Sequence, residues 1–132
     1  MTVFISGTKK NVEIAGALRE RLDALTAQGA AIVIGDCFGA DRCVQEYLAA
    51  AGYRNVTVYV SGAHTRNNAG GWPEVHVDAG SAKGYDFYKA KDIAMADAAD
   101  CALAIWDGES RGTRENIRRM RERGKGVEII RF

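Results

Sequence analysis

The chain has 132 residues, of which 47% are hydrophobic, and its formal net charge is +1 at pH 7. This length fits one domain, expected to span residues 1–132, and the hydrophobic content excludes a disordered chain. The near balance of charge excludes a strong overall attraction to nucleic acid or membranes, and no segment approaches the roughly 20 apolar residues that span a bilayer. Because no basic segment precedes the first apolar run and the three cysteines lack CxxC spacing, we expect a cytoplasmic protein with reduced thiols.

Short β-type runs alternate with helical patterns along the chain. Strands are predicted at residues 2–6, 31–34, 56–60, 101–106 and 127–130. A first helix carries an apolar stripe from Ile14 to Leu25 and ends at Gly29, and further helices are predicted at about 41–51, 85–98 and 115–123. Residues 61–80 break this alternation and hold the only proline, and so long a segment is typical of a lid or an oligomer contact.

The order of these elements predicts the fold class. Parallel strands need crossover connections, which the intervening helices supply. We therefore expect an α/β protein, a Rossmann-like three-layer sandwich with a mainly parallel five-stranded sheet in the order 3-2-1-4-5. In such sheets ligands bind at the carboxyl ends of the strands where the strand order reverses, here between the first and fourth strands.

The turn after the first strand contains Ser6, Gly7 and Thr8, followed by two lysines and an asparagine. Backbone N–H groups at the start of a helix attract anions, and a glycine lets a phosphate approach the backbone. These residues are candidates for ligand binding, although an ordinary tight turn explains them equally well.

The turn after the second strand begins at Gly35 and contains a second glycine, Gly39. Asp36 is expected at the strand end, where its carboxylate would accept hydrogen bonds from ribose hydroxyls. Asp41 is expected near the start of the next helix, where it either faces the ligand or caps the helix.

The turn after the fourth strand carries the strongest single signal. A strand that ends in Trp-Asp-Gly is followed by a Gly-Thr pair that opens a helix, and N–H groups, a hydroxyl and a guanidinium there make a phosphate nest. The tryptophan is expected either to stack on a base or to fill the edge of the core. The candidates in this turn are Trp106, Asp107, Gly108, Ser110, Arg111, Gly112 and Thr113.

The final helix is basic, with seven basic and three acidic residues between Glu109 and Lys125. Such a helix is either a solvated face or a surface that attracts phosphates or single-stranded nucleic acid. Because the histidines of the 61–80 segment lack the spacing of metal ligands, neither a metal site nor a cofactor is predicted.

Three loose motifs follow one another along the chain. They are Gly35-x-x-x-Gly39-Ala40-Asp41-Arg42, Lys91-Asp92-x-x-Met95 with Ala98-Ala99-Asp100, and Trp106-Asp107-Gly108-x-Ser110-Arg111-Gly112-Thr113. Together they resemble the SLOG superfamily, which groups the Smf/DprA DNA-processing proteins with the Lonely Guy cytokinin-activating enzymes, and above all its short bacterial and phage members. The resemblance implies a Rossmann-like fold, homo-oligomerisation and a nucleotide-derived ligand, with the Gly-Thr turn at the phosphate and Lys91 among the binding residues.

Lonely Guy enzymes cleave the N-glycosidic bond of a nucleoside monophosphate with the glutamate of a PGGxGTxxE motif. Here Asn116 occupies the glutamate position, and an amide cannot act as a general base. Glu115 is one residue away, about 100° round a helix. Lys91 and Asp92 replace the arginine and lysine of the family's RKxxM motif. These departures favour ligand binding over hydrolysis.

The favoured function is therefore binding of a nucleotide or nucleotide derivative at the carboxyl edge of the sheet, as a sensor or binding module. The alternative is an N-glycoside hydrolase, similar to phosphoribohydrolases or deoxyribosyltransferases, acting on nucleoside monophosphates. Its candidate catalytic carboxylates would be Asp36, Asp107 and Glu115. Binding of single-stranded nucleic acid through the basic final helix is the least favoured reading.

Overall fold

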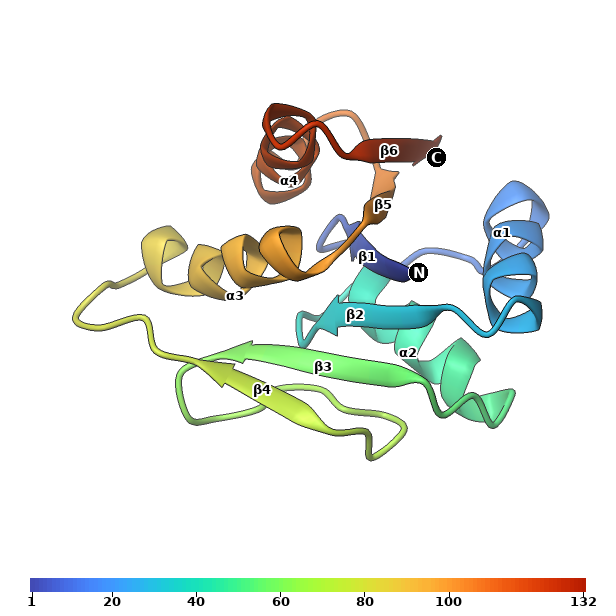
Figure 1. Ribbon diagram of the computed structural model, residues 1–132, viewed down its shortest axis with the longest axis horizontal. Coiled ribbons are helices and arrows are strands. Elements are labelled where there is room, and N and C mark those ends of the chain that lie inside the picture. Colours follow the sequence, from blue (N-terminus) through green and yellow to red (C-terminus); the bar gives the residue numbers. More distant parts are fainter.

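The computed structural model describes residues 1–132, which form one sheet of six parallel strands and four helices (Figure 1). The bounds are β1 (Thr2–Gly7), α1 (Gly16–Ala27), β2 (Ala31–Gly35), α2 (Ala40–Ala50), β3 (Val56–Ser61), β4 (Glu74–Val77), α3 (Tyr85–Ala98), β5 (Cys101–Trp106), α4 (Arg111–Glu122) and β6 (Gly126–Arg131).

The strand order is β4-β3-β2-β1-β5-β6, and each neighbouring pair is parallel. The predicted α/β class and the order of the five expected strands are thereby confirmed. The number of strands was wrong, because β4 adds a sixth strand at the edge beside β3. β4 is short, mostly exposed and preceded by Pro73, so it lacks the buried apolar run by which the other strands were found.

Helices cover both faces of the sheet (Figure 1). The alternation of side chains along β1 shows which helices pack on each face. Val3 and Ile5 pack in the larger core cluster with leucines of α1 and with Val44 of α2. Phe4 points to the opposite face, where the smaller cluster contains Met95 of α3 and Met120 of α4. A strand buried on both faces is apolar throughout, which is why β1 shows a continuous hydrophobic run.

The boundaries of three helices differ from the sequence prediction. Ile14 precedes α1, which begins at Gly16 although the apolar stripe predicted a helical Ile14. Helix α2 begins and ends one residue earlier than expected. Helix α4 begins at Arg111. The sequence prediction places its start near Glu115, because it interprets the glycine at 112 as part of the turn. The Gly-Thr pair therefore lies in the first turn of α4.

The segment between β3 and α3 packs against the body of the fold through several contacts. Trp72 is buried, and its indole N–H donates to the carbonyl of Tyr53 at 2.9 Å. The buried Gln45 amide donates to the carbonyl of Asn67 and accepts from the N–H of Ala69. None of the four helices has the length and apolar character needed to cross a membrane.

Candidate functional site

A cavity of about 520 Å³ opens at the carboxyl edge of the sheet, between the first turn of α4, the turn after β1 and the inner face of α3. This volume is in the range of small-molecule sites. The cavity lies at the predicted reversal of strand order, since β1 pairs with both β2 and β5. Of the predicted ligand-binding residues, its wall contains Ser6, Gly7, Thr8, Asp41, Lys91, Ser110, Arg111, Gly112 and Thr113.

One end of the cavity favours an anion. The first backbone hydrogen bond of α4 runs from the N–H of Arg114 to the carbonyl of Ser110, so the three preceding N–H groups have no backbone acceptor. A Cβ at Gly112 would meet no atom within 4 Å, which leaves the backbone there open to a ligand. Lys9 and Lys10 line the same cavity and add positive charge to the helix dipole.

Asp107 holds this end together without lining the cavity. Its Oδ1 accepts from the N–H groups of Glu109 at 2.9 Å and Ser110 at 2.8 Å, and its Oδ2 accepts from the hydroxyl of Thr8 at 3.0 Å. Lys10 Nζ lies 3.3 Å from the same oxygen. The backbone hydrogen bonds hold the pKa of Asp107 well below its usual range. Asp107 thus joins the turn after β1 to the turn before α4.

Gly39 lets a third turn approach this end. It precedes α2 with a φ of +86°, and a Cβ there would overlap the backbone carbonyl of Lys9. The N–H of Ala40 also donates to the carbonyl of Thr8 at 3.0 Å. Gly39 therefore lets the turn before α2 pack against the turn after β1, but it does not itself line the cavity.

The floor of the cavity carries buried ionisable groups. Asp41 is 7% exposed and Lys91 is 2% exposed, and both lie beside Gly35, whose missing Cβ would be 2.9 Å from Asp41 Oδ2 and 3.2 Å from Lys91 Cε. Lys91 Nζ donates to Asp92 at 3.0 Å and to the carbonyl of Tyr88 at 3.2 Å. Burial raises the pKa of Asp41 to about 7, although Lys91 opposes that change.

The pKa of the Lys91 ammonium is raised. Burial by itself lowers it, and the negative charge of Asp92 is the largest of the effects that raise it. Lys91 therefore carries its charge at neutral pH and keeps one of its three N–H donors free of a partner within the chain.

Two tyrosines of α3 form a wall that sequence reasoning missed. Tyr85 and Tyr88 line the cavity, and the guanidinium of Arg111 lies 4.1 Å from the centre of the Tyr85 ring. Helical periodicity would have found part of this wall, because Tyr88 and Met95 lie three and four residues from Lys91 on the same helix. Cys37, Lys89 and Asn116 also line the cavity.

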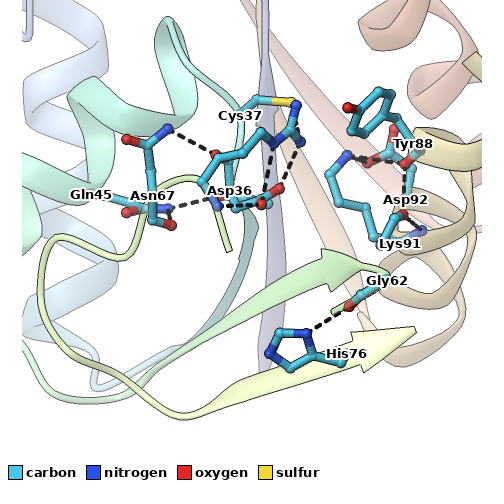
Figure 2. Close-up of polar contacts among 12 residues, drawn as sticks. Asp36, Cys37, Gln45, Gly62, Asn67, His76, Tyr88, Lys91 and Asp92 are labelled. Carbon is cyan, nitrogen blue, oxygen red and sulfur yellow. Dashed lines mark hydrogen bonds and ion pairs between the residues drawn. The ribbon is translucent and has the colours of Figure 1, made fainter. Parts of the chain in front are cut away.

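Asp36 lies in a different environment from the ribose contact expected of it. It is 1% exposed and forms a bidentate ion pair with Arg66, whose Nη2 is 2.7 Å from Oδ1 and whose Nε is 3.3 Å from Oδ2. The N–H of Arg66 also donates to Asp36 Oδ2, and the amide of Asn67 donates to the Asp36 carbonyl (Figure 2). Asp36 anchors the 61–80 segment and does not line the cavity.

The remaining candidates also lie outside the cavity. Trp106 borders a separate surface hollow between α4 and β6, where its indole N–H donates to the carbonyl of Ser110 and Arg131 covers its ring. Gly108 packs against the same arginine. Glu115 pairs with Arg118 outside the cavity. None of the three predicted catalytic carboxylates therefore lines the cavity, whereas Asp41 and Asp92 do.

Comparison with known proteins gives no family assignment. No protein-family model matches the chain, and no curated protein matches it either. No group of three or more His, Cys, Asp or Glu side chains is placed to hold a metal ion. The chemistry of the cavity is therefore the guide to function.

Proposed function

We propose that the chain binds a nucleotide-type ligand in this cavity, with the phosphate at the first turn of α4. The observation that carries the proposal is the joining of free helix N–H groups, lysines and tyrosines in one cavity at the carboxyl edge of a parallel sheet. The similarity of the Gly112-Thr113 segment to the phosphate turn of SLOG proteins supports the same ligand class.

The groups lining the cavity match the parts of a nucleotide. The N–H groups of Gly112 and Thr113 suit phosphate oxygens, and Lys9, Lys10 and Arg111 supply positive charge. The tyrosines of α3 suit the flat face of a base or sugar. The buried polar groups of the floor are left for hydrogen bonds that fix the orientation of the ligand.

Calorimetric titration with a panel of nucleoside 5′-monophosphates tests this function. Gly112→Asp should abolish binding, because a carboxylate would occupy the anion site. Gly126→Asp is the matched control, since a side chain there also meets nothing within 4 Å but lies outside the cavity, and it should bind as the wild type does. Thr113→Ala should weaken binding by about 0.5–1.5 kcal/mol, or by about 3 if the hydroxyl bonds a charged oxygen. A wild-type protein without affinity for any nucleotide would refute the proposal.

Cleavage of the N-glycosidic bond is the second candidate function. The observation in its favour is that two carboxyl groups, Asp41 and Asp92, line one cavity, and that the pKa of Asp41 near 7 suits a proton donor. Incubation of the protein with the same nucleotides would then release free base, and Asp41→Asn would slow that release by orders of magnitude. Nucleotide binding without any base release would leave the binding function alone.

A further inference from the structure

Asp41 carries the only buried side-chain nitrogen or oxygen atom without a hydrogen-bond partner. Its Oδ1 is unpartnered although the side chain belongs to the first turn of α2 and lines the cavity. A buried polar atom left without a partner costs about 1–3 kcal/mol. Because Oδ1 is shielded from the cavity, the carboxyl can meet a ligand only through Oδ2, which is not among the buried atoms and has no hydrogen bond within the chain.

The charges around Asp41 are already balanced without it. Lys91 is paired with Asp92 on α3, and Arg66 is paired with Asp36 where β2 ends. Figure 2 shows Asp36 below Cys37 and the Lys91–Asp92 pair to the right of both. An ionised Asp41 would add an unbalanced negative charge to this group, and a buried charge without a counter-ion is costly.

The thiol of Cys37 adds no charge to this group. Burial raises its pKa, so the thiol stays neutral at physiological pH. Among the groups that face Asp41 from α3, from the end of β2 and from the 61–80 segment, only Lys91 and Arg66 are cationic, and each already has its own carboxylate partner.

We propose that Asp41 binds the nucleotide as a neutral carboxylic acid, donating a hydrogen bond to a carbonyl oxygen or unprotonated ring nitrogen of the nucleobase, so that binding takes up a proton. This inference rests on the proposed function. It assigns a hydrogen-bond partner to the base, which is the end of the ligand away from the phosphate. A neutral carboxyl can donate one hydrogen bond, whereas a carboxylate only accepts. The remaining N–H of Lys91 lies on the same floor and can donate to the same end of the base.

The dependence of affinity on pH tests this inference. For a nucleoside monophosphate that binds, the affinity of the wild type should fall by about tenfold per pH unit above pH 7, because one proton is taken up on binding. The ligand phosphate, which ionises near pH 6, acts in the opposite direction and is largely dianionic in this range. Inorganic phosphate, which has no base, should bind without this loss.

Two variants separate Asp41 from other titrating groups. Asp41→Asn keeps a donor of similar shape and removes the titration, so its affinity should stay constant between pH 7 and 9. Glu46→Gln is the matched control, because Glu46 lies on the same helix, is exposed and pairs with Arg42, and its affinity should fall with pH as the wild type does. An equal pH slope in the wild type and in Asp41→Asn would overturn the inference and leave nucleotide binding intact.

The wild-type protein also gives a direct measurement that needs no variant. Carbon-13 NMR of the Asp41 carboxyl should show that its pKa rises when the nucleotide binds, by the reciprocity of linked equilibria. A carboxyl that is ionised at pH 6 in the complex would refute the inference. An absence of nucleotide affinity at every pH would instead refute the proposed function, on which the inference depends.

Discussion

Two glycines show how single residues shape the cavity edge. The sequence indicates that Gly35 and Gly39 bracket a turn, but their neighbours come from distant parts of the chain. Gly35 leaves room for the Asp41 carboxyl and for Lys91, which lies on α3. Gly39 combines a φ of +86° with close approach to the backbone of Lys9, thirty residues earlier. The first role depends on a missing side chain, and the second also depends on backbone conformation.

Replacement of Gly39 by alanine tests this difference. A φ of +86° with a ψ of −133° is a strained backbone conformation for an L-residue and costs about 1–3 kcal/mol, and the overlap with Lys9 adds to that cost. Urea unfolding should therefore show a loss of more than about 2 kcal/mol. Gly52→Ala is the control, because Gly52 has a φ of +69° and open space around its Cα, so only the conformational cost applies. Equal losses in the two variants would contradict a close approach at Gly39.

At the scale of elements, the sequence predicts regular structure well and contacts between loops poorly. Helix α3 has the predicted bounds, because its apolar spacing and the flanking strands define it. Strand β4 was missed, since an exposed edge strand needs no apolar run. The partner of Asp36 is thirty residues away in a segment without periodicity, so nothing in the sequence identifies Arg66. The sequence analysis therefore expects the Asp36 carboxylate at the ligand, whereas in the structure this carboxylate pairs with Arg66 of the 61–80 segment.

The ion pair between Asp36 and Arg66 should hold the 61–80 segment in place. Arg66→Met leaves a buried carboxylate without its cation, and removal of one partner from a buried pair costs about 3–5 kcal/mol. Because the Arg66 side chain is 28% exposed, we expect a loss of about 3 kcal/mol, with faster amide hydrogen exchange in residues 62–70.

Arg54→Met is the control for this element. The exposed Arg54 donates to the carbonyl of Gly70 in the same segment but neutralises no buried charge, so its loss should cost under about 1 kcal/mol. The double variant with Asp36→Asn and Arg66→Met should recover part of the lost stability, because no unpaired charge then remains. If Arg66→Met and Arg54→Met unfold at the same urea concentration, the pair does not anchor the segment.

For the whole molecule, general rules of chain topology predicted most of the architecture. Parallel strands with intervening helices leave few orders for the sheet, and the five expected strands follow the predicted one. The rules also predicted the edge at which the cavity opens. They did not predict which carboxyl groups face it, because that depends on side-chain partners. Asp107 bonds residues of the cavity wall without lining the cavity, and Glu115 pairs with Arg118 outside it, whereas Asp41 lines the cavity with one buried oxygen unpartnered.

These partners should determine how the stability of the ligand-free protein varies with pH. The pKa of Asp107 is lowered in the folded state, so its contribution is present above pH 4 and is lost as the pH falls further. The pKa of Asp41 is raised from 3.8 to about 7, so the folded state holds that proton more tightly than the unfolded state. The contribution of Asp41 is therefore present at low pH and is lost as the pH rises from about 4 to about 7. The pKa of His76 is also raised from its ordinary value of 6.5, by the Gly62 carbonyl and Glu74. The contribution of His76 to stability is therefore lost as the pH rises above 6.5.

The free energy of unfolding of the ligand-free protein should therefore peak in weakly acidic solution rather than at neutral pH. Between pH 4 and 7 the folded state keeps the Asp41 proton that the unfolded state releases, so stability falls by up to about 1.4 kcal/mol per pH unit. Asp41→Asn has no such proton to lose, so its stability should exceed that of the wild type by a margin that grows over this range and then stays constant. Urea unfolding of both proteins from pH 4 to pH 8 measures that margin. Curves that stay parallel, with or without a constant offset, would mean that the pKa of Asp41 is not raised in the folded protein. A margin that grows between pH 4 and 7 would instead show that the folded protein holds the Asp41 proton at pH values where the unfolded chain has released it.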